Sequence, residues 1–266
     1  MIAIKGFLID LDGVLYTGNR LIDGAVEAID FLRDNEYPFR CVSNSTRKCR
    51  RTLVNHLVSL GLDIPESKIF TPPLAATAHM KKSGRTACYL LLTDDAARDF
   101  SDVKTPDTGT GTDWVVIGDA GDKITYERMN TAFRFLVEGA ELLALENDRY
   151  WMAADGLSLS AGPFACALEY ASGKKATVMG KPSTDFFNLA LEDMQMRPEE
   201  VAMIGDDITT DIGGASRAGM RGILVKTGKY RSDTLDAAAV KPTFIVDSIA
   251  DVPRMVQKGS FGRSER

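Results

Sequence analysis

The feature that most constrains the fold of this chain is an alternation of short, apolar, β-prone runs with longer segments of helical periodicity. Residues 7–11 and 39–43 form two such runs, and apolar residues at helical spacing follow them over 26–32 and 53–60. Strands that alternate with helices predict a mainly parallel sheet with helices on both faces. The chain is therefore expected to have an α/β fold.

The same alternation returns near the C-terminus. A helical pattern over 189–194 precedes apolar runs at 201–205 and 222–225, and another helical segment, 208–218, lies between those runs. Residues 244–246 predict a last strand at the edge of the sheet. The two ends of the chain therefore predict one common parallel-sheet core.

The middle of the chain carries its own strand and helix patterns. We expect strands at 88–92, 114–117, 141–145 and 150–153, and helices at 94–100, 125–137 and 163–170. Turn-rich segments, Thr71-Pro72-Pro73 and Gly180-Lys181-Pro182, flank this region. The prediction is a core domain of residues 1–76 and 180–262, and an inserted α/β cap domain of residues 77–179.

Length, charge and cysteine usage exclude several classes of protein. The chain has 266 residues, which suffice for two domains, and its net charge of −5 disfavours nucleic-acid binding because an acidic surface repels phosphate backbones. No apolar stretch is long enough to span a membrane, and the N-terminus lacks the basic region of a signal peptide. With no C-x-x-C pair among four cysteines, zinc is disfavoured. We expect a cytoplasmic protein.

Two carboxylates follow the first predicted strand. Asp10 and Asp12 lie at its carboxyl end, where parallel sheets bind ligands, and Gly13 allows a tight turn. We interpret Asp10 as a metal ligand and as the nucleophile that attacks phosphorus, and Asp12 as the general acid and base. Backbone N–H groups of the turn can hold phosphate oxygens. The alternative is a turn that carries two solvated acids.

Polar residues follow other strands as well. Ser43 and Asn44 can hydrogen-bond a phosphate oxygen, although a residue of this type also caps helices. Lys181 can neutralise phosphate as a compact charge. It is not part of a P-loop, because the Gly and the Ser or Thr of that pattern are missing at positions 175 and 182.

A second acidic strand end follows residues 201–205. Asp206 can face Asp10 across the sheet and complete an oxygen site for Mg²⁺, and Asp207 or Asp211 can orient the ligands behind it. These acids can equally cap the helix that follows, and both interpretations can hold together. Two acidic strand ends, a hydroxyl strand end and a lysine together predict phosphate chemistry.

At these residues the chain resembles the haloacid dehalogenase-like (HAD) phosphatase superfamily. Asp10-Leu11-Asp12-Gly13-Val14 resembles its first motif, D-x-D-x-[TV], and Ser43 and Lys181 resemble the second and third. Gly205-Asp206-Asp207, with Asp211, resembles the acidic fourth motif. The four motifs span nearly the whole chain in the order of the family.

The resemblance extends to one branch of the superfamily. The large insertion followed by Val178-Met179-Gly180-Lys181-Pro182 is similar to the NagD-like branch with an α/β cap. Residues 162–164, 167–171 and 224–230 resemble the subgroup that includes phospholysine phosphohistidine inorganic pyrophosphate phosphatase.

This resemblance implies a Rossmann-like core and a Mg²⁺-dependent phosphatase that forms an aspartyl-phosphate on a small phosphorylated metabolite. Action on pyrophosphate or P–N bonds and a homodimer are implied too. The metal ligands would be the Asp10 carboxylate, the Asp12 main-chain carbonyl and Asp206. The phosphate contacts would be Lys181, Ser43, Asn44 and the backbone N–H groups of Leu11 and Gly13.

Substrate selectivity is expected to lie in the cap domain. Arg149 and the Gly156–Pro163 segment, interpreted as a loop that contains Gly162, are candidate contacts, although each can also be an ordinary turn residue. Two other functions stay open: a phosphomutase-type transferase, and a non-catalytic module that binds a phosphate ligand on the same fold. A dinucleotide-dependent oxidoreductase is disfavoured because no G-x-G-x-x-G motif is present.

Overall fold

The computed structural model describes residues 3–104, 111–153 and 155–258 and divides the chain into two compact units. The core unit consists of Met1–Ser43, Val54–Phe70 and Lys181–Arg266, and the cap unit consists of Asn44–Leu53 and Thr71–Gly180. The inserted second α/β unit is confirmed. The domain boundaries after residues 76 and 179 stay predictions.

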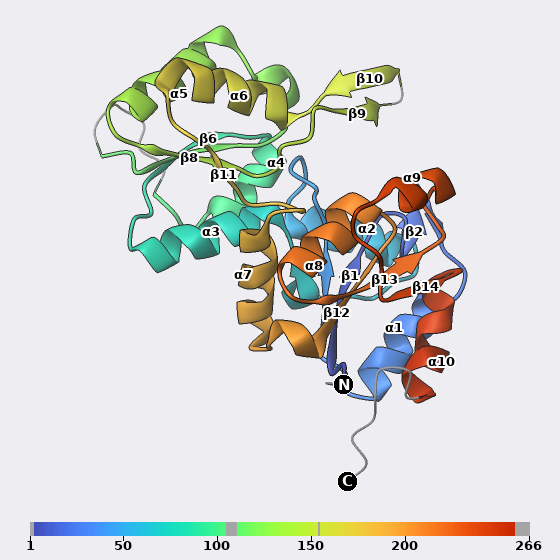
Figure 1. Cartoon of the computed structure of the whole chain (residues 1–266). Helices are drawn as coiled ribbons and strands as arrows, with labels where there is room; N and C mark the ends of the chain where they lie inside the picture. Colours follow the sequence, from blue (N-terminus) through green and yellow to red (C-terminus); the bar gives the residue numbers. More distant parts are fainter. Residues whose placement is uncertain (1–2, 105–110, 154, 259–266) are drawn as a thin grey trace. The chain divides into compact units, whose positions relative to one another are not determined.

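A six-stranded parallel sheet, with strand order β14-β13-β12-β1-β4-β5, forms the centre of the core unit (Figure 1). Its two middle strands are buried at every residue, because uninterrupted apolar runs suit a sheet covered on both faces. A short antiparallel pair, β2–β3, follows β1 in the chain. The strands are β1 (Gly6–Asp10), β2 (Tyr16–Thr17), β3 (Arg20–Leu21), β4 (Phe39–Val42), β5 (Ile69–Phe70), β12 (Val201–Gly205), β13 (Arg221–Val225) and β14 (Phe244–Val246).

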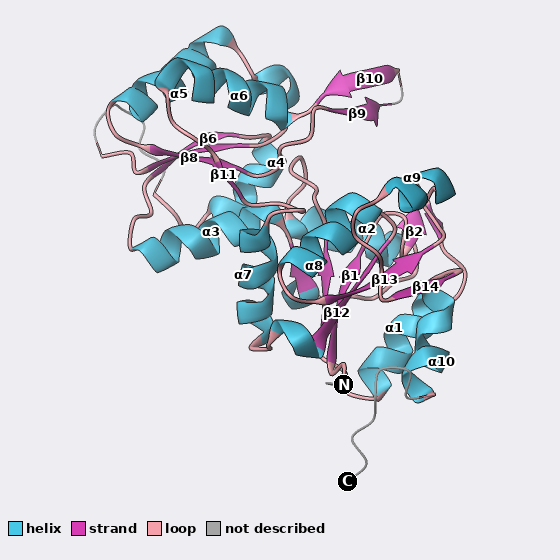
Figure 2. Cartoon of the chain, in the orientation of Figure 1, coloured by secondary structure: helices cyan, strands magenta, loops and turns pink. Residues whose placement is uncertain are grey.

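Helices cover both faces of this sheet. Figure 2 shows α7 and α8 on one side and α1 and α10 on the other. The π-helical segment η5 (Ile208–Gly213) leads directly into α8. The other helices are α1 (Ala25–Asp34), α2 (Arg50–Ser59), which begins in the cap unit, α7 (Thr184–Met194), α8 (Gly214–Arg217), α9 (Ser232–Ala237) and α10 (Val252–Gln257), with 3₁₀ turns η1 (Glu66–Lys68), η4 (Pro198–Glu200) and η6 (Ile249–Asp251).

The cap unit is built on a four-stranded parallel sheet with the order β11-β8-β7-β6. The helices α5 and α6 pack together on one face, and α3 lies on the other face (Figure 1). Its elements are α3 (Pro72–Ser83), β6 (Cys88–Leu91), α4 (Asp94–Ala97), η2 (Arg98–Phe100), β7 (Trp114–Ile117), η3 (Gly121–Lys123), α5 (Tyr126–Val137), β8 (Glu141–Ala144), β9 (Tyr150–Ala153), β10 (Gly156–Leu159), α6 (Ala161–Ser172) and β11 (Thr177–Val178).

Two segments of the cap unit differ from expectation. Pro72 and Pro73 do not mark a turn; they occupy the first positions of α3, where a missing N–H costs nothing. The interpretation of Gly156–Pro163 as a loop is wrong. Leu157 and Leu159 alternate with small residues and pair with β9 in an antiparallel hairpin, and α6 begins at Ala161.

Among the described residues, none of the helices combines the length and the hydropathy that a bilayer-spanning segment requires. The buried side chains are mostly apolar, and three acidic residues buried in the core unit, Asp10, Asp206 and Asp211, gather at one edge of its sheet. That edge contains the candidate site.

Candidate active site

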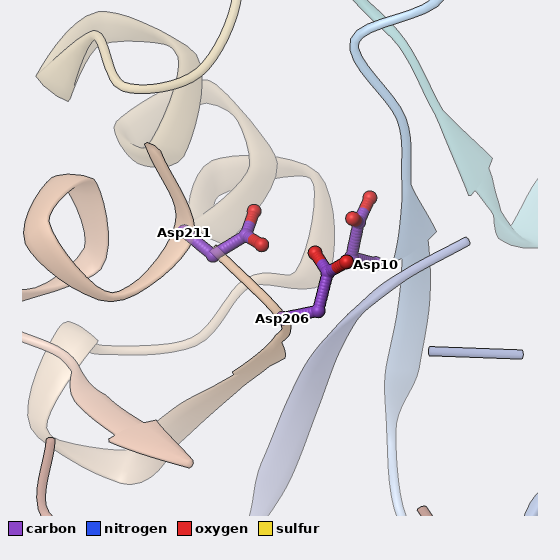
Figure 3. Close-up of side chains that lie close together, drawn as sticks. All are labelled: Asp10, Asp206 and Asp211. Carbon is purple, nitrogen blue, oxygen red and sulfur yellow. The ribbon is translucent and has the colours of Figure 1, made fainter. Parts of the chain in front are cut away.

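Three buried carboxylates meet at the carboxyl edge of the core sheet. Asp10 ends β1, and Asp206 directly follows the neighbouring strand β12, whose residue Ile204 pairs with Ile9. Asp211 lies in η5. One carboxylate oxygen from each residue lies within 4.8 Å of the other two (Figure 3). Parallel register brings the first two together, as predicted, and η5 adds the third.

Lys181 is the positive charge of this cluster. Its Nζ lies 2.6 Å from Asp10 Oδ1 and 2.7 Å from Asp211 Oδ1, and the lysine is buried. Burial alone lowers the pKa of Lys181, but the two carboxylates raise it above its usual value, so the lysine stays charged. Burial raises the pKa of Asp10 despite the attraction of Lys181.

The charge balance of the cluster favours a further cation. Two lysines, Lys181 and Lys229, act on the three carboxylates, so negative charge stays in excess. A bound metal ion would relieve the mutual repulsion of these carboxylates in a buried site. Carboxylate oxygens are the ligands that hard divalent cations prefer. The donor set of Asp10, Asp206 and Asp211 is therefore consistent with a divalent metal site.

The loop after β13 holds the Asp206 carboxylate in place. The backbone N–H of Lys229 donates to Asp206 Oδ2 at 2.6 Å, and the Thr227 hydroxyl donates to the carbonyl of Gly13. Gly228, with φ +57°, leaves room for this approach: a Cβ there would lie 2.0 Å from Asp206 Oδ2. Burial and the neighbouring Asp211 raise the pKa of Asp206 to about 6.

We expect Gly228→Ala to lower the free energy of unfolding by more than the ~1–2 kcal/mol that left-handed backbone costs an L-residue. The added methyl group must displace the Asp206 carboxylate, so divalent-cation affinity should fall as well. Urea unfolding and Mg²⁺ calorimetry measure the two effects.

A matched control for this substitution is Gly18→Ala. Gly18 has φ +60° and nothing within 4 Å of the position that its methyl group would take, so its replacement adds backbone strain without a clash. Equal losses of stability in both variants, with Mg²⁺ affinity retained, would show that Gly228 does not support Asp206.

Gly13 approaches the cluster as closely as Gly228. It has φ +88°, and a Cβ on it would lie 1.9 Å from Asp206 Oδ2. Its backbone N–H donates to the carbonyl of Tyr16 at 2.7 Å, and the N–H of Leu11 hydrogen-bonds the Asp10 carboxylate. Both N–H groups therefore have acceptors within the chain, and their predicted contacts with phosphate stay predictions.

Asp12 and Asp207 take different positions around the cluster. Asp12 is exposed and its carboxylate is not among the three that converge, so its predicted side-chain role and carbonyl ligation stay predictions. Asp207 Oδ1 accepts the N–H groups of Thr209 at 2.8 Å and Thr210 at 3.0 Å, which makes it the N-cap of η5. The capping interpretation of Asp207 is confirmed, and a supporting role beside the cluster is compatible with it.

Ser43 lies at the same edge of the sheet. Val42, the last residue of β4, pairs with Asp10, and Ser43 follows it. Asn44 opens the next segment and belongs to the cap unit, where its Oδ1 would lie 2.9 Å from a Cβ on Gly180. The predicted contacts of both residues with phosphate stay predictions.

The two selectivity candidates lie in the cap unit near the base of the β9–β10 hairpin. Arg149 is exposed, and its carbonyl accepts the N–H of Ser160. Gly162 is buried in the first turn of α6, where a Cβ would lie 2.6 Å from the carbonyl of Asp148. Close backbone packing gives Gly162 a structural reason for being glycine, and its role in selectivity stays a prediction.

Sequence reasoning missed the loop Thr227-Gly228-Lys229 as part of the site. The available signal was its position: it follows a parallel strand at the carboxyl edge, as the recognised motifs do. Asp211 was predicted only to orient the ligands from behind, whereas its carboxylate accepts a hydrogen bond from Lys181 directly.

Two protein-family models match the segments of the chain that carry these residues. A model described as haloacid dehalogenase-like hydrolase matches residues 7–105, and one described as HAD-hydrolase-like matches residues 178–252. The chain is 43% identical over 246 residues to haloacid dehalogenase-like hydrolase domain-containing protein 2 of Bos taurus, covering 92% of this chain and 93% of that protein. It is 39% identical over 255 residues to human phospholysine phosphohistidine inorganic pyrophosphate phosphatase, covering 94% and 93%.

Solved structures show the same architecture. NagD from Escherichia coli K-12 superposes with a TM-score of 0.86 at 26% identity, over 94% of this chain and 98% of that one. A 4-nitrophenylphosphatase from Thermotoga maritima superposes with a TM-score of 0.87 at 28% identity, over 96% and 98%. The similarity therefore covers both units of the chain.

Proposed function

Because the chain belongs to the haloacid dehalogenase-like hydrolases, in their NagD-like branch, we propose that it is a Mg²⁺-dependent phosphatase of a small phosphorylated substrate. The observation that carries the proposal is the buried cluster in which Lys181 bonds Asp10 while Asp206 and Asp211 lie beside them. Burying this excess of negative charge lowers the stability of the fold. Clusters of this kind are found mainly at functional sites.

Asp10 is the nucleophile of the proposed reaction. An oxygen of its carboxylate attacks phosphorus, the bond to the leaving oxygen breaks, and Asp12 gives that oxygen a proton. Water then attacks the aspartyl-phosphate, Asp12 takes up a proton from it, and inorganic phosphate leaves while Asp10 is regenerated. The exposure of Asp12 suits a group that must exchange protons with water.

The remaining groups position and neutralise the phosphoryl group. Lys181, held by Asp10 and Asp211, offers a fixed positive charge, and Ser43 at the same sheet edge offers a hydroxyl. Bound at Asp10 and Asp206, with the Asp12 carbonyl, Mg²⁺ would supply further neutralisation of the phosphate charge. Asn44 and the N–H groups of Leu11 and Gly13 complete the proposed phosphate contacts.

The names of the relatives indicate which substrate classes to test first. Since one of them is called a phospholysine phosphohistidine inorganic pyrophosphate phosphatase, pyrophosphate and P–N phosphoramidates belong in the first screen beside phosphate monoesters. The predicted homodimer and cytoplasmic location stay predictions. Arg149 and Gly162 are the cap positions to vary once a substrate is identified.

Hydrolysis of 4-nitrophenyl phosphate, measured with MgCl₂ and with EDTA, tests the proposal. We expect turnover that needs the metal and releases inorganic phosphate. An isomerised sugar phosphate without phosphate release would instead favour the phosphomutase-type transferase. Binding of Mg²⁺ and phosphate without turnover of any phosphorylated compound would favour the binding module.

The pH dependence of metal binding follows from the pKa of Asp206, which lies near 6 in the folded protein without metal and at 3.8 for a free side chain. Between these values the folded state holds the proton that the unfolded state has released, so the metal-free protein loses stability as pH rises through this window. Mg²⁺ binds the ionised carboxylates, so its stabilising effect grows over the same window.

We therefore expect the increase in Tm that Mg²⁺ causes to be larger at pH 7 than at pH 5. Thermal unfolding in MgCl₂ and in EDTA at both pH values measures it. An increase of the same size at both pH values would place the metal on groups other than Asp206.

A further inference from the structure

Lys229 lies beside the acidic cluster, and the mechanism proposed above does not use its side chain. Its backbone N–H donates to Asp206 Oδ2 at 2.6 Å. Lys229 also lines a cavity of about 300 Å³ whose wall includes Asp206 and Asp207. The ammonium is therefore attached, through one lysine side chain, to the residue that holds a proposed metal ligand in place.

The carboxylates of the cluster divide between two lysines. Lys181 donates hydrogen bonds to Asp10 and Asp211. Burial raises the pKa of Asp206, and of the two lysine charges that oppose this rise, the charge of Lys229 has the larger effect. Asp206 therefore depends on Lys229 for positive charge more than on the lysine that bonds the other two carboxylates.

The Lys229 ammonium acts on these carboxylates through space. Burial lowers its pKa, but Asp207, Asp10 and Asp206 raise the pKa above its usual value, so the side chain stays charged. Among the described residues, no carboxylate oxygen lies within 4.0 Å of this ammonium. The residue is exposed, so water screens its charge and the side chain is not held by a direct ion pair.

A divalent cation at Asp206 would take over the role of this ammonium. The ion and the lysine both bring positive charge to the same carboxylate, and like charges repel each other over such distances. Lys229 then stabilises the cluster when the metal is absent and opposes the metal when it binds. Its backbone N–H has the opposite influence, because it fixes the Asp206 carboxylate.

We propose that the side chain of Lys229 weakens the binding of a divalent cation at the acidic cluster, because its ammonium is the counter-charge of Asp206 in the metal-free protein. The inference rests on the Mg²⁺ dependence of the proposed function. Lys229 is thus a positioning residue whose backbone orients a metal ligand and whose side chain limits how tightly the ion is held.

The test is Mg²⁺ calorimetry on Lys229→Met, with Lys229→Arg and Lys226→Met as controls. Lys229→Met removes the charge and retains the backbone N–H to Asp206, whereas Lys229→Arg retains both. Lys226 pairs with Asp247 at 2.8 Å, outside the described cavity lining, and its replacement causes the same change of net charge. Because the pKa of Asp206 is about 6, measurement at pH 8 leaves its carboxylate ionised.

We expect the Kd for Mg²⁺ to fall about threefold to tenfold in Lys229→Met, the effect of one screened charge on a divalent ion. Lys229→Arg and Lys226→Met should keep the wild-type Kd. A Kd that is unchanged or larger in Lys229→Met, or an equal fall in either control, would overturn the inference.

Thermal unfolding gives a second measurement that needs no turnover. In EDTA, Lys229→Met should have a lower Tm than the wild type, because Asp206 loses its counter-charge, and MgCl₂ should raise the Tm of the variant by more. An equal decrease of Tm in EDTA and in MgCl₂ would show a structural defect alone and would contradict the inference.

The same measurements separate this inference from the phosphatase proposal. If the wild type binds Mg²⁺ and Lys229→Met binds it more tightly, but no phosphorylated compound is turned over, the phosphatase function fails and the inference stands. If the wild type shows Mg²⁺-dependent turnover and the Kd is unchanged in Lys229→Met, the inference fails alone.

Discussion

Asp10→Asn is expected to lower kcat/KM for 4-nitrophenyl phosphate by at least roughly 10³-fold, because the amide cannot form the aspartyl-phosphate. The fold should remain, since Asn matches the shape of Asp and removes a charge whose burial is unfavourable. Steady-state kinetics give the first quantity, and thermal unfolding in EDTA gives the second, where we expect no decrease of Tm.

The reason for pairing the two measurements is that they separate chemistry from folding. Asp10 lies 2.6 Å from Lys181 and is one of three carboxylates around that lysine, so Asp211 remains to neutralise it in the variant. Asp185→Asn, at an exposed acid in the first turn of α7, is the control for a change of one charge. Turnover that survives in Asp10→Asn would place the nucleophile at another residue.

Lys181→Met is expected to cause the largest loss of stability, roughly 3–5 kcal/mol at pH 7, because it leaves the buried carboxylates of Asp10 and Asp211 without their cation. Activity should fall with it, since the fixed charge that faces the phosphate is lost. Urea unfolding at pH 7 measures the first effect.

A matched control for this variant is Lys5→Met. Lys5 forms an ion pair with Glu200 at 2.7 Å, and the distance between Lys181 and Asp211 is the same. The Lys5 side chain, however, is 61% exposed. An ion pair with one exposed partner contributes about 0–1 kcal/mol, and Glu200, whose side chain is 12% exposed, keeps Arg197 as a second partner, so a small loss is expected there. If the losses of stability differ in this way, burial of the charges, and not the mere presence of an ion pair, accounts for the larger loss in Lys181→Met.

A second substitution tests the cause of the loss. Adding Asp211→Asn to Lys181→Met removes one of the two uncompensated charges and should recover part of the stability. Lowering the pH from 7 should have the same direction of effect, because burial raises the pKa of Asp211 and the lysine that lowers it is absent from this variant, so the carboxyl group takes up a proton and becomes neutral. A loss that is independent of both changes would indicate a packing defect at residue 181.

Several strands match their predicted positions, and they show where the local sequence is sufficient to predict secondary structure. The uninterrupted apolar runs before Asp10 and Asp206 predicted strands buried on both faces, as observed, and adjacent parallel strands bring their carboxyl ends to one edge. The strand at 114–117 and the hairpin strand at 150–153 were predicted with their observed bounds. Composition misled at Gly156–Leu159, where small residues hide a strand whose existence depends on pairing with β9.

The sequence by itself determined the α/β class, the inserted second unit and the edge of the sheet at which Asp10 and Asp206 meet, because these follow from periodicity and strand direction. The place of Lys181 beside them was implied by the family resemblance. Only the tertiary structure decided that Asp211 shares Lys181 with Asp10 and that the loop at Gly228 closes on Asp206. The physical reason is that these contacts join residues far apart in the chain, such as Thr227 and Gly13, and depend on packing distances that no local pattern encodes.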